Sequence, residues 1–368
     1  MTTSIANQRR FKRRLLTKIK VRGRAAQSTI GRPLLKKEID RFLASHATQS
    51  LALYKIWQKE DRETAMSQWR QWQSPSVPYK LQRLSVGKMA WYPKKRSTSG
   101  FRKICLLPTQ LKMWHSLAKD LVCALYETGP HIGGWPGRSR DKQVREVAGV
   151  ITSRDQWVVV ADVVKAFASF NPNTIYQLHS LPENLLRRAI DSRRLKFTGG
   201  MRSNPAWAPD KSMCDDLEMG PTGLLEGSPA SNAIFSVFMD DLPDHMPDGI
   251  TPFVYCDNII LVCPSEALAQ QAATSLVEYL SRHQAGPFEV RYDCQPVWHE
   301  FDHLGYSIRH NGGFTSLGLA SKNWMKLQRK IEGVAEGKIE PLEWLRTSFA
   351  ALQEHERFPY EMMIADGH

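Results

Sequence analysis

The stretch FVYCDNIILV, residues 253–262, places a single carboxylate, Asp257, between two runs of apolar and aromatic residues. This pattern predicts two short strands, residues 253–256 and 259–263, joined by a tight turn at Asp257 and Asn258. Asp and Asn are frequent turn residues, so the stretch alone favours a plain hairpin turn. A carboxylate at a hairpin tip acquires a chemical role only when a second polar group lies beside it.

A second carboxylate, Asp162, ends another apolar run, WVVVADVV at residues 157–164. Strand-end carboxylates that are far apart in the sequence can lie side by side in a sheet. Mg²⁺ is usually held by one or two carboxylates together with substrate phosphates. Two such ions about 3.5 to 4 Å apart serve phosphoryl transfer. The alternative is that both acids are structural, and the spacing of the two residues leaves both interpretations open.

The charge of the chain is concentrated at its N-terminal end. The sequence has 50 Lys and Arg against 37 Asp and Glu, a net charge of +13. Twelve of the basic residues lie in residues 1–37, where there is no acid, and the remaining chain carries 38 basic and 37 acidic residues. A segment of one sign predicts binding to a polyanion, with nucleic acid as the first choice. A solvated tail and an organellar transit peptide are the alternatives.

Composition excludes several other classes of protein. No apolar run approaches the roughly 20 residues that cross a bilayer, and no secretory signal begins the chain, so we expect a cytoplasmic protein without a membrane partner. The six cysteines form no CxxC pair, which argues against a zinc site or a disulfide framework. We expect reduced thiols that are mostly packed.

Apolar spacing predicts helices separated by short strands. The predicted helices are residues 38–73, 109–126, 141–151, 266–283, 321–335 and 341–355. Gly and Pro residues in GGWPGRSR, residues 133–140, predict a loop before the third of these helices. In GLLEGSPASNAIFSVFMDDL, residues 223–242, a turn-rich loop leads into a helix with Ser228 as N-cap and Pro229 as first residue. HLGYSI, residues 303–308, predicts a strand pair.

Six blocks in this order resemble the motifs of the reverse transcriptases, in particular the bacterial, group II intron-like branch. RKICLLPT (102–109) resembles the fingers motif, and GGWPGRSRDKQVREV (133–147) resembles the loop and helix that follow it. WVVVADVVKAF (157–167), the 223–242 block, FVYCDN (253–258) and HLGYSI resemble motifs A, B, C and E. The blocks span residues 102–308. Their order is a more specific sign of the resemblance than any single block is.

The resemblance implies an α+β, right-hand polymerase fold. Fingers would span residues 38–155, and the palm, an antiparallel sheet with helices, residues 156–310. Part of the fingers would be inserted in the palm at about 171–222. A short helical thumb would span residues 311–368, and residues 1–37 would be a basic N-terminal arm.

The implied activity is RNA-directed DNA polymerisation, in which nucleotides are added to a primer 3′ end on an RNA template. Asp162 and Asp257 would hold two Mg²⁺ ions, with Mn²⁺ as a substitute and the backbone carbonyl of Val163 as a further ligand. Asn258 would be the third catalytic position. Incoming dNTPs would contact Arg102, Lys103, Phe167, Glu226 and Gly227, and the primer end would contact Leu304, Gly305 and Tyr306.

Phe167 would be the aromatic gate under the sugar, which favours a DNA product; a core phenylalanine is the alternative. For Arg102 and Lys103, the alternative is that both are solvated charges on the surface. Two positions depart from the family pattern, because Glu226 stands where Gln is usual and Asn258 where a second Asp is usual. An RNA-dependent RNA polymerase and an inactive nucleic-acid-binding scaffold therefore remain as alternative functions. The resemblance also implies an RNA template and a DNA or RNA primer. The roughly 60 residues after the motif E block leave no room for an endonuclease, maturase or ribonuclease H segment, so we expect a free-standing role such as a retron, diversity-generating, phage-defence or domesticated enzyme.

Overall fold

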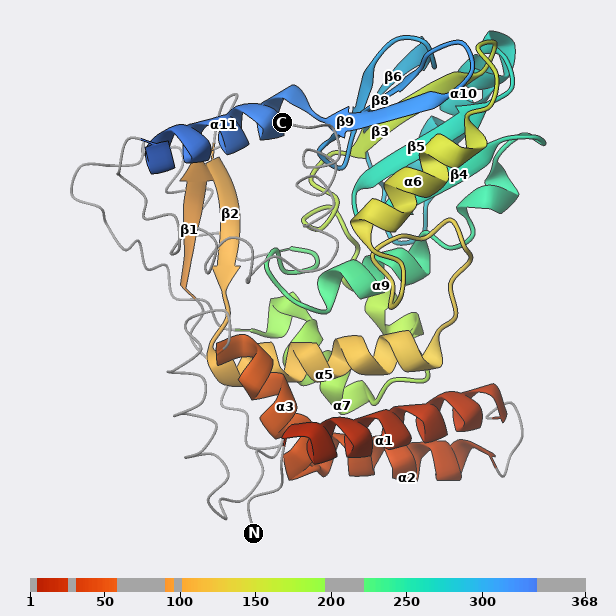
Figure 1. Ribbon diagram of the computed structural model, residues 1–368. Helices are drawn as coiled ribbons and strands as arrows, with labels where there is room; N and C mark the ends of the chain where they lie inside the picture. Colours follow the sequence, from red (N-terminus) through yellow and green to blue (C-terminus); the bar gives the residue numbers. More distant parts are fainter. Residues whose placement is uncertain (1–4, 26–30, 58–89, 96–100, 196–221, 336–368) are drawn as a thin grey trace, which may run out of the picture. The chain divides into compact units, whose positions relative to one another are not determined.

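The computed structural model describes residues 5–25, 31–57, 90–95, 101–195 and 222–335. The chain divides into two compact units. The helical unit comprises residues 1–127, 165–237 and 284–287, and the sheet unit comprises residues 128–164, 238–283 and 288–368. Helices and antiparallel strands are both present (Figure 1), which confirms the α+β class.

Four helices form the frame of the helical unit: α1 (Ile5–Ala25), α2 (Gly31–Ala44), α3 (His46–Trp57) and α5 (Thr109–Leu125). Helix α1 contacts the other three. Its Leu15 and Ile19, four residues apart on one face, are buried. The basic N-terminal segment is therefore a folded part of this unit over residues 5–25, rather than an extended arm.

Helix α5 agrees within one residue with the predicted helix 109–126. Its buried residues Trp114, Leu117 and Leu121 recur every three or four positions, as expected for a helix with one apolar face. The predicted helix 38–73 is wrong at its start, since α2 begins at Gly31 and a break at Ser45 separates it from α3. Residues 58–73 of that prediction lie outside the described residues.

Short elements complete the helical unit. Strands β1 (Ala90–Lys95) and β2 (Phe101–Leu106) form an antiparallel pair. Among the described residues, the short helices of this unit are η2 (Thr174–Gln177), α7 (Glu183–Leu185), η3 (Leu186–Ile190), η4 (Ser192–Arg194) and α9 (Ser231–Phe238), whose last residue belongs to the sheet unit. Buried Asp191 holds two of them together by accepting hydrogen bonds from Tyr176 Oη at 2.8 Å and Arg193 Nε at 2.9 Å.

The main sheet of the sheet unit has four antiparallel strands in the order β4-β5-β3-β6. These strands are β4 (Thr251–Tyr255), β5 (Asn258–Cys263), β3 (Trp157–Val163) and β6 (Val290–Pro296). Helix α10 (Glu266–Arg282) packs against β3, β5 and β6. Gln270 Nε2 of α10 lies 3.8 Å from Cys294 Sγ, which places α10 on the face of the sheet that carries Cys294 and its cross-strand partner Val159.

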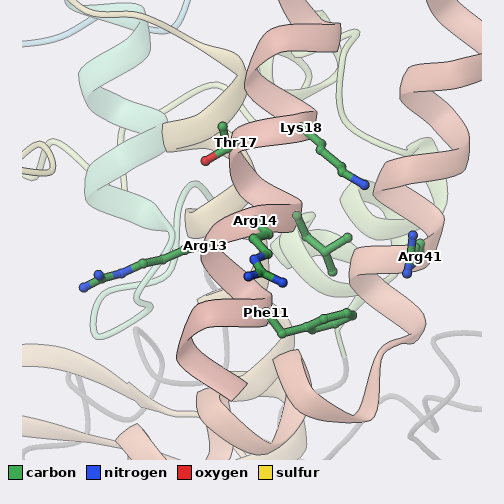
Figure 2. Close-up of a pocket in the computed structure, with 7 residues that line it drawn as sticks. Phe11, Arg13, Arg14, Thr17, Lys18 and Arg41 are labelled. Atoms are coloured by element: carbon green, nitrogen blue, oxygen red, sulfur yellow. The ribbon is translucent and has the colours of Figure 1, made fainter. Parts of the chain in front are cut away.

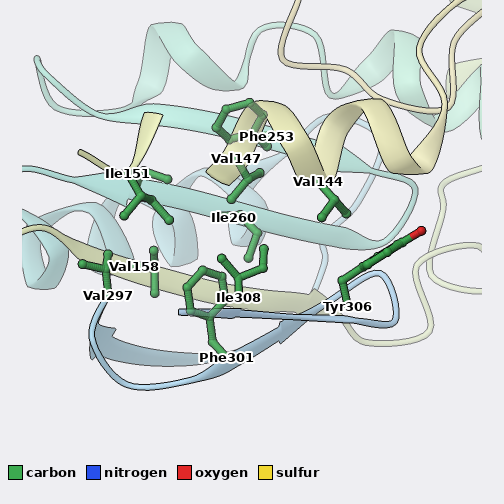
Figure 3. Close-up of a cluster of buried hydrophobic side chains, with 11 residues drawn as sticks. Val144, Val147, Ile151, Val158, Phe253, Ile260, Val297, Phe301, Tyr306 and Ile308 are labelled. Carbon is green, nitrogen blue, oxygen red and sulfur yellow. The ribbon is translucent and has the colours of Figure 1, made fainter. Parts of the chain in front are cut away.

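The opposite face of this sheet is covered by α6 (Arg140–Val150) and by a second sheet of β7 (Phe301–His303), β8 (Tyr306–His310) and β9 (Thr315–Leu319). Figure 3 shows side chains of α6, of the four-stranded sheet and of β7 and β8 meeting in one apolar cluster. Its members include Val144, Val147, Val158, Phe253, Ile260, Phe301, Tyr306 and Ile308. Strand β5 is consequently buried except at Asn258, and β3 is buried except at Trp157, Val160 and Asp162.

The loop before α6 is fixed along the outer edge of β4. Gly133 N donates to Val254 O at 2.7 Å, and Val254 N donates to His131 O at 2.8 Å. The Arg138 guanidinium donates to the carbonyl groups of Thr128 and Gly129. Ser139 Oγ accepts from Lys142 N at 3.2 Å and caps α6, which agrees within one residue with the predicted helix 141–151.

The remaining elements of the sheet unit are η5 (Leu242–His245) and α11 (Ser321–Ala335). Helices α10 and α11 confirm the predicted helices 266–283 and 321–335, and β7 with β8 confirms the strand pair around HLGYSI. The predicted helix 341–355 lies outside the described residues. None of the helices in the described ranges combines the length and the apolar character that crossing a bilayer requires.

Candidate functional site

Strand pairing brings the two predicted carboxylates to one end of the four-stranded sheet. Asp162, near the end of β3, lies opposite Asn258, the first residue of β5. Val163 N donates a hydrogen bond of 2.8 Å to Asp257 O, so the segment that carries Asp162 is tied directly to Asp257. Asp162 is exposed and Asp257 half-buried, so both carboxylates can reach a ligand.

The hairpin turn differs by one residue from the prediction. Tyr255 pairs with Asn258, so the turn is Cys256-Asp257, and Asn258 belongs to β5. The reason is tertiary, because Asn258 also pairs with Asp162 and is thereby held in the ladder. Asn258 Nδ2 donates to Asp257 Oδ1 at 3.0 Å, which orients the carboxylate.

A row of four residues crosses the sheet at this end: Tyr255, Asn258, Asp162 and Arg291, one from each strand. Residues that lie directly opposite each other in antiparallel strands have side chains on the same face, with Cβ atoms about 5 Å apart. The row therefore presents one carboxylate between an amide and an exposed guanidinium, with Asp257 beside them. Reasoning from the sequence missed Arg291, because the register of β6 against β3 has no local signal.

The residues predicted for nucleotide binding all belong to the helical unit, and the loop that precedes α9 contacts Phe167. The Phe167 ring is half-buried and meets the Phe235 ring edge to face, with centroids 5.9 Å apart. Phe167 O accepts from Leu224 N at 2.8 Å. A Cβ atom on Gly223 would lie 2.0 Å from Phe167 O, so only glycine permits this approach. The motif B block is thus fixed against the backbone of Phe167.

The same loop reaches strand β2. Glu226 O accepts from Cys105 N at 3.3 Å, and Gly227 is exposed with a left-handed φ of +87°. Arg102 and Lys103 lie on β2, opposite residues 94 and 93 of β1. Their backbone is placed by this pairing, whereas their side chains lie outside what the structure describes.

Ser228 has a different role from the predicted N-cap, since α9 begins only at Ser231. Ser228 Oγ lies 2.5 Å from His115 Nδ1, and His115 Nε2 lies 2.6 Å from Ala189 O. The carbonyl group requires a proton on Nε2, so Nδ1 accepts from the Ser228 hydroxyl. Complete burial lowers the pKa of His115 to about 4. No motif in the sequence pointed to His115.

The segment predicted to contact the primer is a tight turn with a buried anchor. Leu304 and Gly305 have φ values of +52° and +87°, as in a type I′ turn, and Asn323 Nδ2 donates to Gly305 O at 2.9 Å. Tyr306 is buried, its hydroxyl donates to Asp141 Oδ1 at 2.7 Å, and burial raises its pKa. The turn, rather than the Tyr306 side chain, is therefore what this segment presents to a ligand.

Non-glycine residues with left-handed backbone occur at three described positions: Lys165, Cys256 and Leu304. This conformation costs roughly 1 to 2 kcal/mol for a residue with a Cβ atom. The three lie in the blocks 157–167, 253–258 and 303–308, which also contain predicted site residues, and Cys256 directly precedes Asp257. Backbone strain of this kind concentrates at functional sites.

Comparison with known proteins gives no assignment, because no protein-family model matches the chain and no curated protein matches it significantly.

Proposed function

We propose that the chain is an RNA-directed DNA polymerase whose reaction centre is the Asp162–Asp257 pair. The observation that carries the proposal is the hydrogen bond from Val163 N to Asp257 O, together with the pairing of Asp162 and Asn258. Two acidic residues separated by 95 positions in the sequence are thus carried to the same end of two paired, largely buried strands. The fingers, palm and thumb assignments are part of the same proposal.

The donor set fits divalent cations. Asp162 and Asp257 supply carboxylate oxygens, and the backbone carbonyl of Val163 is the further ligand we propose. Bound Mg²⁺ or Mn²⁺ would increase the acidity of the attacking hydroxyl and stabilise the leaving oxygen of phosphoryl transfer. Asn258 orients Asp257 through its amide, and Arg291 adds a fixed positive charge suited to phosphate oxygens.

Discrimination between sugars is assigned to Phe167. Its backbone is held by Leu224 and its ring by Phe235, so the ring has little freedom to move aside. A ring fixed in this way can exclude a 2′-hydroxyl by steric overlap, which is why we propose dNTPs as substrates. The exposed turn at Gly227 and the turn at Leu304-Gly305 are the proposed contacts for nucleotide and primer.

Primer extension on an RNA template tests the proposal. We expect wild-type protein to incorporate dNTPs in preference to rNTPs, and Asp162→Ala and Asp257→Ala to abolish synthesis with circular dichroism spectra unchanged. Asp155→Ala, an exposed acid that precedes β3 at its other end, is the matched control and should keep full activity. Phe167→Ala should increase rNTP use relative to dNTP use, by up to a few kcal/mol of lost discrimination.

The same assay separates the alternatives. Wild-type preference for rNTPs would identify an RNA polymerase instead. Binding of a primer–template without extension in either Mg²⁺ or Mn²⁺ would identify an inactive scaffold. Activity that survives Asp257→Ala would reject the reaction centre as assigned.

A further inference from the structure

Two sets among the basic residues of α1 have different surroundings. Members of the first set are ion-paired within the helical unit and hold α1 against its neighbours. Their pairs are Lys12 with Asp120, Lys20 with Glu127 at 3.2 Å, Arg24 with Glu127, and Arg22 with Glu38 at 3.9 Å. The ion pairs of these four cations stabilise the helical unit, and this role explains their presence on α1.

The second set, Arg13, Arg14 and Lys18, lines a cavity of about 510 Å³ between α1 and α2, to which α2 contributes Arg41. Figure 2 shows Arg14, Lys18 and Arg41 around it, with Phe11 on one side. Phe11, Arg14, Leu15 and Lys18 lie on one face of α1 at the spacing of successive helical turns. Among the residues that the structure describes, neither Arg14, Lys18 nor Arg41 has a carboxylate within ion-pair distance.

Unpaired cations that share a cavity repel one another and raise the local concentration of anions. Besides Arg13 and Thr17, the rest of the lining consists of two apolar side chains, Leu15, which is buried, and Phe11, which is half-buried. The Arg41 guanidinium lies 5.9 Å from the centre of the Phe11 ring, so charge and aromatic surface adjoin. The ligand that suits this lining has both negative charge and a flat, weakly polar surface.

We propose that this cavity binds one nucleotide unit of a single-stranded nucleic acid. Phosphate groups would contact Arg14, Lys18 and Arg41, whose donors match phosphate oxygens. The base would stack on Phe11, as bases do on aromatic residues of proteins that bind single strands. An acidic peptide would satisfy the cations but would leave the Phe11 surface unused, so nucleic acid is the occupant that uses both.

Binding is measured by fluorescence anisotropy with a labelled single-stranded oligonucleotide, full-length protein and EDTA in the buffer, over a series of salt concentrations. The double variant Arg14→Gln, Lys18→Gln should weaken binding and reduce the slope of log affinity against log salt by about 1.4, because each lost phosphate contact contributes about 0.7. Lys36→Gln with Lys37→Gln on α2 removes the same charge away from the cavity and should change the slope less. Equal effects of the two double variants would overturn the proposal in favour of a diffuse charge effect.

Phe11→Leu separates a nucleotide site from a general anion site. We expect it to weaken oligonucleotide binding about tenfold through lost stacking and to leave binding of inorganic polyphosphate unchanged. Equal loss for both ligands, or no loss for the oligonucleotide, would reject the base contact. Tighter binding of polyglutamate than of the oligonucleotide would identify an acidic protein partner and overturn the proposal.

This site needs no metal and shares no residue with the Asp162–Asp257 pair. Asp155→Ala, which changes an exposed acid outside both sites, should therefore bind the oligonucleotide as wild type does. The proposal fails if the cavity variants bind normally, whether or not the protein extends a primer.

Discussion

Asn258 determines the charge of the proposed reaction centre. It contributes an amide rather than a carboxylate, so the end of the sheet carries the two charges of Asp162 and Asp257 and the opposing charge of Arg291. Two divalent ions would be only partly neutralised by this set. The consequence is weaker metal binding than a site with three carboxylates would have.

Asn258→Asp should therefore lower the Mg²⁺ concentration for half-maximal primer extension, by about tenfold for one added carboxylate next to the ion. Wild type should be stimulated by Mn²⁺, which binds more tightly than Mg²⁺ to a site containing nitrogen or amide groups. Calorimetric titration with Mn²⁺ checks the affinity without requiring activity. Asn311→Asp, in the β8–β9 turn, adds the same charge elsewhere. It should leave both the Mg²⁺ concentration for half-maximal extension and the Mn²⁺ affinity unchanged.

Arg291 should have opposite effects on metal and on nucleotide. Arg291→Ala removes a positive charge that lies beside the carboxylates and repels the metal ion. Mn²⁺ affinity should therefore rise several-fold, since screened repulsion on the order of 1 kcal/mol is lost. The same variant should raise the KM for dNTPs, because a phosphate contact is lost. Arg291→Lys, which keeps the charge, should raise the KM less than Arg291→Ala does. If KM stays constant and only Mn²⁺ affinity changes, Arg291 is a neighbouring charge without a substrate contact.

At the scale of the element, the β4–β5 hairpin is built around a residue in an unfavourable conformation. Cys256 has a φ of +55°, which glycine adopts freely and a β-branched residue avoids. The pairing of Asn258 with both Tyr255 and Asp162 enforces the turn in spite of this cost.

Cys256→Gly should keep or raise the free energy of unfolding, by up to about 1 kcal/mol, since the strain is relieved. Cys256→Val should lower it by about 2 kcal/mol. Urea denaturation followed by circular dichroism provides the measurement. A Val variant as stable as wild type would show that the turn changes conformation to accommodate the side chain.

Long elements with clear apolar periodicity could be predicted from the sequence, as α5, α6, α10 and α11 show. Helix α1 could not, because twelve cations in residues 1–37 obscure an apolar stripe that consists mainly of Leu15 and Ile19. Within the site, Asp162 and Asp257 were predictable as acids at strand ends. Arg291 and His115 were not, since the first depends on the register between distant strands and the second on a contact across 113 positions.

At the scale of the whole molecule, each unit contains a histidine that is buried in its neutral form. Burial lowers the pKa of His115 to about 4 in the helical unit and that of His303 to about 3 in the sheet unit, from 6.5. The unfolded chain therefore binds more protons than the folded chain between pH 6.5 and these values. Stability is fully present above pH 6.5 and falls as the pH decreases toward 4.

As the pH decreases from 6.5 to 4, each of the two histidines should lower the free energy of unfolding by on the order of 3 kcal/mol, because it binds a proton only in the unfolded chain. Urea midpoints measured at pH 7 and pH 5 would detect the loss. His303→Phe should reduce the loss of stability in acid. Because His303 Nε2 has no hydrogen-bond partner among the described residues, this variant breaks no hydrogen bond of that atom to them. Exposed His179→Gln is the control and should leave the pH dependence intact.

The division of the chain also has a consequence for biosynthesis. The polypeptide passes between the two units at five points, and neither unit is a continuous stretch of sequence. Strand β3 leaves the ribosome early, but its partners β5 and β6 begin only at Asn258 and Val290. Until β5 is complete at Cys263, the apolar WVVV run has no ladder to join, and such unpaired strands favour aggregation. Chains released before residue 263 should therefore depend on chaperones far more than the complete chain does, which a pulse-labelled truncation series can measure.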